Sequence, residues 1–105
     1  MAVEIGQLAP DFTLVDQFGQ RVTLSDFRGS KNVVLMFFPF AFSRDCTSEL
    51  GQVREHYAQL VSDGAQMLSV SCDSSFTLKS FAQQESLSHP LLSDFWPHGA
   101  VTRQY

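Results

Sequence analysis

The feature that most constrains the fold is a strand-length run of apolar residues that leads into a helix-length segment. The run covers residues 32–38, and its apolar side chains are continuous rather than alternating. Such a run is typical of a central strand that is buried on both faces. Residues 39–45 do not readily continue the strand, whereas five apolar side chains of residues 46–63 recur at helical spacing before a stop at Gly64, namely Leu50, Val53, Tyr57, Leu60 and Val61. The sequence therefore predicts a strand, a loop and an amphipathic helix in that order.

The same alternation continues after Gly64. Residues 65–72 predict a second buried strand, and Ser74 or Ser75 is suited to cap a helix that runs to about residue 87. Three apolar residues of that helix are expected to face inward, namely Phe76, Phe81 and Ala82.

Smaller elements are expected towards both ends of the chain. Residues 12–15 and 21–24 alternate in character around a turn that contains Gly19, which predicts an N-terminal β-hairpin. Residues 90–92 predict a third strand, and Pro97 suits an early position in a helix that continues into the C-terminus.

Strands that alternate with helices predict an α/β fold in which residues 1–105 form one domain. Crossovers between parallel strands are expected to be right-handed, and such sheets carry their sites at the carboxyl ends of the strands. Cys46 and Cys72 both follow predicted strands, so both are expected at that end of the sheet.

Composition and charge argue against several classes of function. The formal charge of −4 is spread along the sequence, and the 7 Lys and Arg residues form no basic stripe, so neither nucleic acid nor membrane is expected as a partner. The longest apolar stretch, residues 33–42, is much shorter than the about 20 residues that span a bilayer. The first residues lack the pattern of a secretory signal peptide, and two cysteines make no disulfide framework. We therefore expect a cytoplasmic protein whose thiols act chemically.

Cys46 is the candidate for that chemistry because it lies at the start of a predicted helix, directly after a buried strand. Unpaired N–H groups and the helix dipole favour a thiolate there, and such positions can lower a cysteine pKa from about 8.5 to roughly 3.5–7.5. The Ser43 hydroxyl can donate a hydrogen bond to the sulfur or to a bound oxygen. Asp45 and Glu49 count partly against this, since an acid that faced the sulfur would raise its pKa.

The residues around Cys46 resemble the signature of the peroxiredoxins. Pro39, Ser43 and Cys46 match the proline, the threonine or serine, and the cysteine of that family. Further similar segments extend over essentially all 105 residues: Ala9-Pro-Asp-Phe-Thr-Leu, Phe37-Phe-Pro, Glu49 and Pro90-Leu-Leu-Ser-Asp. Residues 38–43 and 92–101 are most similar to the one-cysteine alkyl hydroperoxide reductase E subgroup.

This resemblance implies a thioredoxin-like fold and a thiol-dependent peroxidase. Cys46 would attack hydrogen peroxide or an organic hydroperoxide and become a sulfenic acid. Pro39 would shield the pocket, Ser43 would hold the reacting oxygens, and N–H groups at the helix start would stabilise the developing charge. An external thiol, either a small molecule or a thioredoxin- or glutaredoxin-like protein, would reduce the enzyme. No metal or organic cofactor is required.

The resemblance also implies parts that follow residue 105 in the family. They are C-terminal strands, a final helix and an arginine that activates the thiolate, and neither Arg44 nor Arg103 is equivalent to that arginine by position. The domain is therefore expected to be incomplete, with an open sheet edge that favours a homodimer or higher association. The alternative function is a poorly active thioredoxin-like module that acts by association or partner binding.

The cysteines also allow interpretations other than a peroxidase. Cys46 could be a buried structural cysteine, and Cys72 is expected to be an inert or partly buried strand cysteine rather than a resolving one. Thioredoxin-type disulfide exchange needs a second cysteine where Glu49 stands.

Two further groups of side chains have less distinctive expectations. The three histidines, His56, His89 and His98, are too dispersed for a zinc site and are expected at the surface or partly packed. Four aromatic residues are expected either in the core or at the rim of a dimer interface, namely Phe40, Phe42, Phe95 and Trp96.

Overall fold

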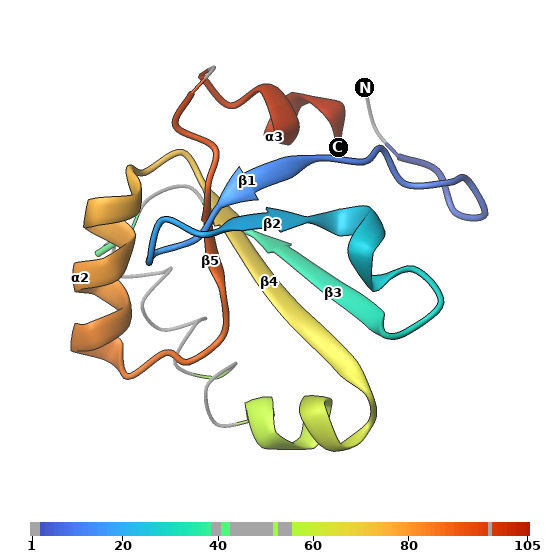
Figure 1. Ribbon diagram of the computed structural model, residues 1–105, viewed down its shortest axis with the longest axis horizontal. Helices are drawn as coiled ribbons and strands as arrows, with labels where there is room; N and C mark the ends of the chain where they lie inside the picture. The colour runs from blue at the N-terminus through green and yellow to red at the C-terminus, as the bar shows by residue number, and fades with distance from the viewer. Residues whose placement is uncertain (1–2, 39–40, 43–51, 53–55, 97) are drawn as a thin grey trace.

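The computed structural model describes residues 3–38, 41–42, 52, 56–96 and 98–105, which form a mixed five-stranded sheet with helices (Figure 1). The strands are β1 (Thr13–Val15), β2 (Arg21–Thr23), β3 (Asn32–Phe37), β4 (Ala65–Ser71) and β5 (Leu91–Ser93). Their order in the sheet is β2-β1-β5-β4-β3; β3, β4 and β5 are parallel, and β1 is antiparallel to both of its neighbours. The α/β prediction is confirmed.

The N-terminal hairpin is confirmed, and its turn explains why β1 and β2 pair. Leu14 lies opposite Val22, and the Asp16 carboxylate accepts hydrogen bonds from the N–H groups of Phe18 and Gln20, each at 2.9 Å. Gly19 has a φ of +77°, a conformation that costs glycine less than other residues. A short 3-10 helix, Leu24–Phe27, follows β2.

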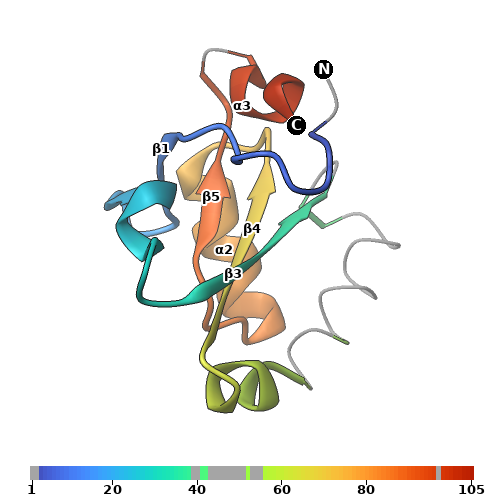
Figure 2. The ribbon, with the colours of Figure 1, turned by 90° about the vertical axis from the view of Figure 1, so that its right-hand side faces the viewer.

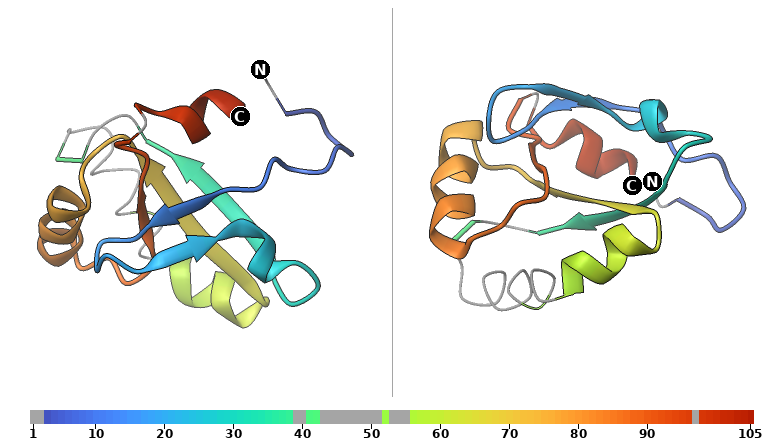
Figure 3. Two further views of the ribbon diagram at one scale, coloured as in Figure 1. Left: turned by 45° about the horizontal axis from the view of Figure 1, so that its top comes forward. Right: turned by 60° about the horizontal axis from the view of Figure 1, so that its bottom comes forward.

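Helices cover both faces of the sheet (Figures 2 and 3). α2 (Ser75–Glu85) begins at its N-cap Ser74, whose hydroxyl accepts the Thr77 N–H at 3.3 Å, and it packs on the face that Met36 and Leu91 share. The short helix α3 (Ala100–Gln104) covers the opposite face. Described residues of the predicted 46–63 helix are helical at 52 and 56–62, and the helix ends before Gly64, whose φ is +77°.

Two apolar clusters form the core, one on each face of the sheet. The α2 side contains six buried residues: Phe38, Leu78, Phe81, Ala82, Leu87 and Leu91. The other side contains five: Phe12, Leu14, Leu68, Val70 and Leu92. The prediction that Phe76 faces inward is wrong, because its side chain is 83% exposed. Leu78, which is spaced three and four residues from Phe81 and Ala82, takes the inward position instead. Val61, one of the five apolar residues at helical spacing in the predicted 46–63 helix, is 53% exposed.

The residues before β1 are attached to the C-terminal residue. The Tyr105 hydroxyl donates a hydrogen bond to the Pro10 carbonyl, and its ring lies against Phe12 and Phe37, with centroids 6.1 and 5.6 Å away. Burial raises the pKa of the Tyr105 phenol, and the nearby Asp11 carboxylate adds to this effect.

β3 was predicted to be a central strand, but it has a strand on only one side among the described residues. It lies at one end of the described sheet and pairs there with β4, from Asn32 opposite Ala65 to Phe37 opposite Val70. Val34 remains 41% exposed. A continuous apolar run cannot distinguish a central from an edge strand, because the neighbouring strand comes from a distant part of the chain.

Candidate active site

The carboxyl ends of the three parallel strands meet at one edge of the sheet. Phe37 lies opposite Val70, and Ser71 lies opposite Ser93, so the residues that follow β3, β4 and β5 are brought together. The predicted catalytic residues Pro39, Ser43 and Cys46 lie outside the described residues. Phe38, Ala41 and Phe42, which flank them in sequence, are described and lie at this edge.

Asp73 connects the segment after β3 to the end of β4. Its Oδ2 accepts hydrogen bonds from the Ala41 N–H at 2.7 Å and from the Ser71 hydroxyl at 2.8 Å. The Ser71 Oγ in turn accepts the Asp73 N–H at 3.2 Å, and the Ser93 hydroxyl donates to the Asp73 carbonyl at 2.6 Å. Two strand ends therefore hold Asp73: Ser71 bonds its carboxylate, and Ser93 bonds its backbone carbonyl.

Aromatic packing holds the same segment from the α2 side. The Phe38 N–H extends the ladder of β3 by donating to the Val70 carbonyl at 2.9 Å, and the buried Phe38 ring lies 6.1 Å from that of Phe81. Phe42 has a φ of +67°, which is unfavourable for a residue with a side chain. Its ring makes an edge-to-face contact with Phe81 at 5.1 Å, which helps to offset this cost.

Asp94 organises the segment after β5. The buried carboxylate accepts the N–H of Val101 at 3.2 Å, and both the N–H and the hydroxyl of Thr102 at 2.7 Å each. Its own N–H donates to the Ser71 carbonyl at 2.7 Å. The sequence interpretation assigned no role to Asp73 or Asp94, although an acid that closely follows each predicted strand was a usable signal.

Cys72 follows β4 directly and is a free, exposed cysteine, so the expectation of a partly buried strand residue is wrong. β4 ends one residue earlier than predicted, at Ser71, and this places Cys72 in the bend beyond the sheet. A Cβ atom at Gly99 would lie 3.2 Å from the Cys72 Sγ, so the buried Gly99 permits this close approach. The φ of +73° at Gly99 is a second reason for glycine there.

The histidines occupy different environments. His56 and His98 are exposed, as expected, but His89 is buried, which contradicts the expectation. The His89 Nε2 lies 2.8 Å from the Ser69 Oγ, and burial lowers the His89 pKa from 6.5 to about 4. Gln17 encloses this region, because its side-chain amide donates to the His89 carbonyl at 3.1 Å and accepts the Leu91 N–H at 2.8 Å.

Large aromatic side chains are exposed near the carboxyl edge. Phe95 and Trp96 are 56% and 70% exposed, and together with Phe76 they line a pocket of about 320 Å³ at the start of α2. Phe42 is also exposed, so the core interpretation is wrong for Phe42, Phe95 and Trp96; Phe40 lies outside the described residues.

Among the residues that the structure describes, His, Cys, Asp and Glu side chains do not gather in a group of three that could hold a metal ion. None of the helices that the described residues form has the length and apolar character needed to cross a membrane.

Sequence and structure comparisons agree on one family. The profile of the AhpC/TSA family matches residues 5–105. Alkyl hydroperoxide reductase E of Mycobacterium tuberculosis is 48% identical over 103 residues, which cover 98% of this chain and 67% of the relative. Peroxiredoxin Bcp of Escherichia coli is 37% identical over 92 residues, which cover 88% of this chain and 58% of the relative. The crystal structure of peroxidoxin BcpB from M. tuberculosis superposes with a TM-score of 0.88 at 32% identity, and the match covers 95% of this chain and 64% of that one.

The fold is that of the thioredoxin-like peroxidases, as the superposition with a peroxiredoxin confirms. The chain belongs to the AhpC/TSA family, the peroxiredoxins, which are thiol-dependent peroxidases. The predicted family and fold are thus confirmed. The chain spans about two thirds of the length of these relatives.

Proposed function

We propose that Cys46 is the peroxide-attacking thiolate of this chain. The sulfur forms a bond to one oxygen of a hydroperoxide while the O–O bond breaks, and the leaving oxygen takes a proton and departs as water or an alcohol. Cys46 becomes a sulfenic acid. The observation that carries this proposal is the position of Ala41 and Phe42, which come directly before the Ser43–Cys46 motif and lie at the carboxyl edge where such sheets carry their sites.

Pro39 and Ser43 support Cys46 in this proposal. The Ser43 hydroxyl holds the attacked and leaving oxygens, Pro39 shields the pocket from water, and the N–H groups at the start of the helix stabilise the developing charge. This chemistry requires neither a metal nor an organic cofactor, because the thiolate supplies the electron pair.

An external thiol completes the cycle. It attacks the sulfenic sulfur, releases water and forms a mixed disulfide, which a second thiol reduces. We favour a small thiol or a thioredoxin- or glutaredoxin-like protein over Cys72 as the reductant. A cytoplasmic location fits this chemistry, because reducing compartments keep thiols such as the free Cys72 reduced.

The test compares the reduced wild-type chain with Cys46→Ser and Cys72→Ser. Each receives one equivalent of hydrogen peroxide in the presence of dimedone, and the labelled residue is located by mass spectrometry. We expect an adduct on Cys46 in the wild type and in Cys72→Ser, formed faster than with free cysteine, and no adduct in Cys46→Ser. Labelling of Cys72 alone, or labelling no faster than free cysteine, would contradict the proposal.

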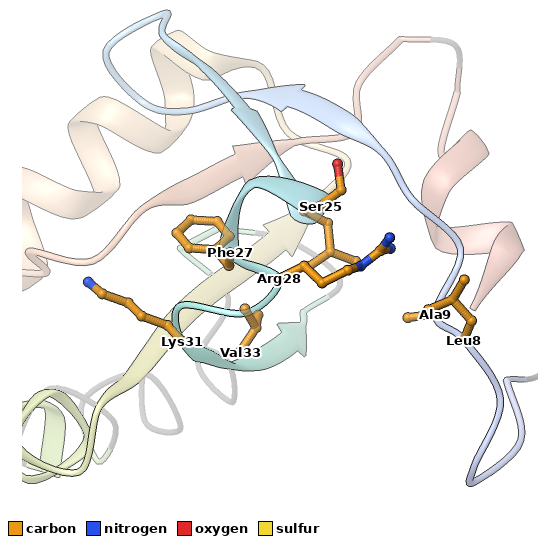
Figure 4. A pocket seen from close by; sticks show the side chains of 8 residues that line it. Leu8, Ala9, Ser25, Phe27, Arg28, Lys31 and Val33 are labelled. Carbon is orange, nitrogen blue, oxygen red and sulfur yellow. The ribbon is translucent and has the colours of Figure 1, made fainter.

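A second candidate function is association through β3, as in a thioredoxin-like module that binds a second copy of itself. Residues 32–37 contain no charge, proline or glycine, the usual devices that protect an edge strand from pairing. An apolar pocket of about 180 Å³ lies beside the start of this strand (Figure 4). Its lining includes Leu8, Phe27 and Val33. A second β3, antiparallel and with Leu35 opposite Leu35, would keep matching side chains on the same face of a continuous sheet.

A homodimer could also form through the exposed aromatic patch of Phe76, Phe95 and Trp96. The patch presents both projecting rings and a pocket, so two copies related by a two-fold axis could each insert a ring into the other. Val34→Lys and Trp96→Lys distinguish the two surfaces when molar mass is measured by light scattering across a concentration series. We expect Val34→Lys to abolish association, and a dimer lost only in Trp96→Lys would assign the interface to the aromatic patch.

A further inference from the structure

We propose that Asp73 is a positioning residue for the peroxidase reaction, because its carboxylate fixes the backbone that leads into the Cys46 motif. This inference rests on the proposed function. Asp73 would act on Cys46 through the backbone of Ala41, without contact with the peroxide.

The contacts of Asp73 suit this role. Its Oδ2 lies 2.7 Å from the Ala41 nitrogen, and the same oxygen receives the Ser71 hydroxyl at 2.8 Å. The Ser93 hydroxyl holds the Asp73 carbonyl at 2.6 Å. Because Ser71 and Ser93 end neighbouring paired strands, the acceptor that Asp73 offers to Ala41 is held in place before any substrate binds.

The described residues on either side of Pro39, namely Phe38 and Ala41, are hydrogen-bonded to β4 and to the bend that follows it, respectively. Phe38 donates to the Val70 carbonyl at 2.9 Å, and Ala41 donates to Asp73 at 2.7 Å. A peroxidase of this kind depends on geometry, and a displacement of about 1 Å can cost on the order of 10²-fold in rate. Loss of the Asp73 acceptor would release one of these two attachments while the other remained.

Three substitutions separate the hydrogen bond, the charge and general surface effects. Asp73→Ala removes the acceptor, and Asp73→Asn removes the charge but can keep an amide oxygen directed at the Ala41 N–H. Asp63→Ala is the matched control, because Asp63 is an exposed acid whose side chain accepts from Gln59 at 3.2 Å, at the opposite end of β4.

Two rate constants of Cys46 are measured in each variant of residues 1–105: one with hydrogen peroxide, by dimedone trapping, and one with iodoacetamide. Iodoacetamide reports thiolate availability without requiring the peroxide geometry. We expect Asp73→Ala to lower the peroxide rate at least about tenfold with a much smaller effect on alkylation. Asp73→Asn should recover most of the peroxide rate, and Asp63→Ala should match the wild type.

An Asp73→Ala chain that is folded, as circular dichroism would establish, and reacts with peroxide at the wild-type rate would overturn the positioning role. A parallel fall in the peroxide and alkylation rates would also overturn it. If Asp73→Ala does not fold, Ser71→Ala decides, since it removes the hydroxyl that orients the carboxylate and should lower the ratio of the two rates. An unchanged ratio refutes the proposal. The wild-type rate relative to free cysteine tests the proposed function separately.

Discussion

Acidification should destabilise this protein through the protonation of His89. The His89 ring is buried between the sheet and the helical segment 56–62, with its Nε2 2.8 Å from the Ser69 Oγ and its ring centroid 5.7 Å from that of Tyr57. A charged imidazolium would lose its hydration in this environment, so burial lowers the pKa to about 4.

The direction follows from the difference between the folded and unfolded states. Between pH 6.5 and about 4 the unfolded chain binds a proton at His89 and the folded chain does not, so the free energy of unfolding falls as the pH falls through this window. The His89 pKa is 6.5 in the unfolded chain and about 4 in the folded one. At about 1.4 kcal/mol for each pKa unit, this difference corresponds to about 3 kcal/mol in the free energy of unfolding. About 2 kcal/mol of this should be lost between pH 7 and pH 5.

Urea unfolding at pH 7 and pH 5 would measure this loss. His89→Gln is the informative variant, because a glutamine amide can replace the hydrogen bond to Ser69 but does not titrate. His56→Gln is the control, because His56 is exposed and hydrated in both states. The other ionisable groups are common to all three chains, so their contributions should largely cancel.

We expect the wild type and His56→Gln to lose about 2 kcal/mol more than His89→Gln when the pH falls from 7 to 5. The same loss in all three chains would refute the argument. It would mean that water or an anionic group reaches His89 in the folded protein.

Three further predictions concern stability and can be checked by urea unfolding at pH 7. Phe81→Ala should lower the free energy of unfolding by about 3–5 kcal/mol, because the Phe81 side chain is fully buried between α2 and the sheet. The exposed Phe76 serves as the control, and Phe76→Ala should change it by less than about 0.5 kcal/mol. Equal effects would mean that Phe81 does not make the main contact between α2 and the sheet. Ser74→Ala should cost about 1 kcal/mol through loss of the α2 N-cap, and a Ser74→Asp variant should retain the cap. Tyr105→Phe should cost about 1 kcal/mol, since it leaves the Pro10 carbonyl without this donor, and no loss would show that water replaces the hydroxyl.

The elements that the sequence predicts well are those with strong local signals. Ser74 caps α2 as expected because a serine at this position can satisfy a free N–H group at the helix start. Gly19 marks the hairpin turn because its positive φ is a local requirement. Which face of α2 packs on the sheet was harder to predict. Phe76 and Phe81 are five residues apart, so they lie on different sides of a helix and cannot both face the sheet. The three- and four-residue spacing of Leu78, Phe81 and Ala82 identifies the buried face.

Long-range relations escaped the sequence interpretation. The apolar run of β3 predicts a strand buried on both faces, but its residues are only half-buried or exposed, and its place at one end of the described sheet emerged only with the strand order. Asp73 and Asp94 each follow a predicted strand closely, but the sequence does not show which residues they bond. Their roles depend on Ala41, 32 residues before Asp73, and on Thr102, which α3 brings back to Asp94. The family motif around Cys46, by contrast, was recognisable from residue identity and spacing alone.

The proposed edge and the proposed active site share one strand, and this makes a final prediction possible. β3 carries the apolar edge along residues 32–37, and Phe38, the next residue, begins the segment that Asp73 holds. Pairing with a second β3 would add main-chain hydrogen bonds and reduce local opening of the strand. The rate constant of Cys46 with peroxide, expressed per chain, should therefore rise over the concentration range in which the molar mass doubles, and Val34→Lys should keep the lower rate at every concentration. If the mass doubles while the rate per chain stays constant, the edge and the motif are energetically independent, and association is a property of the sheet alone.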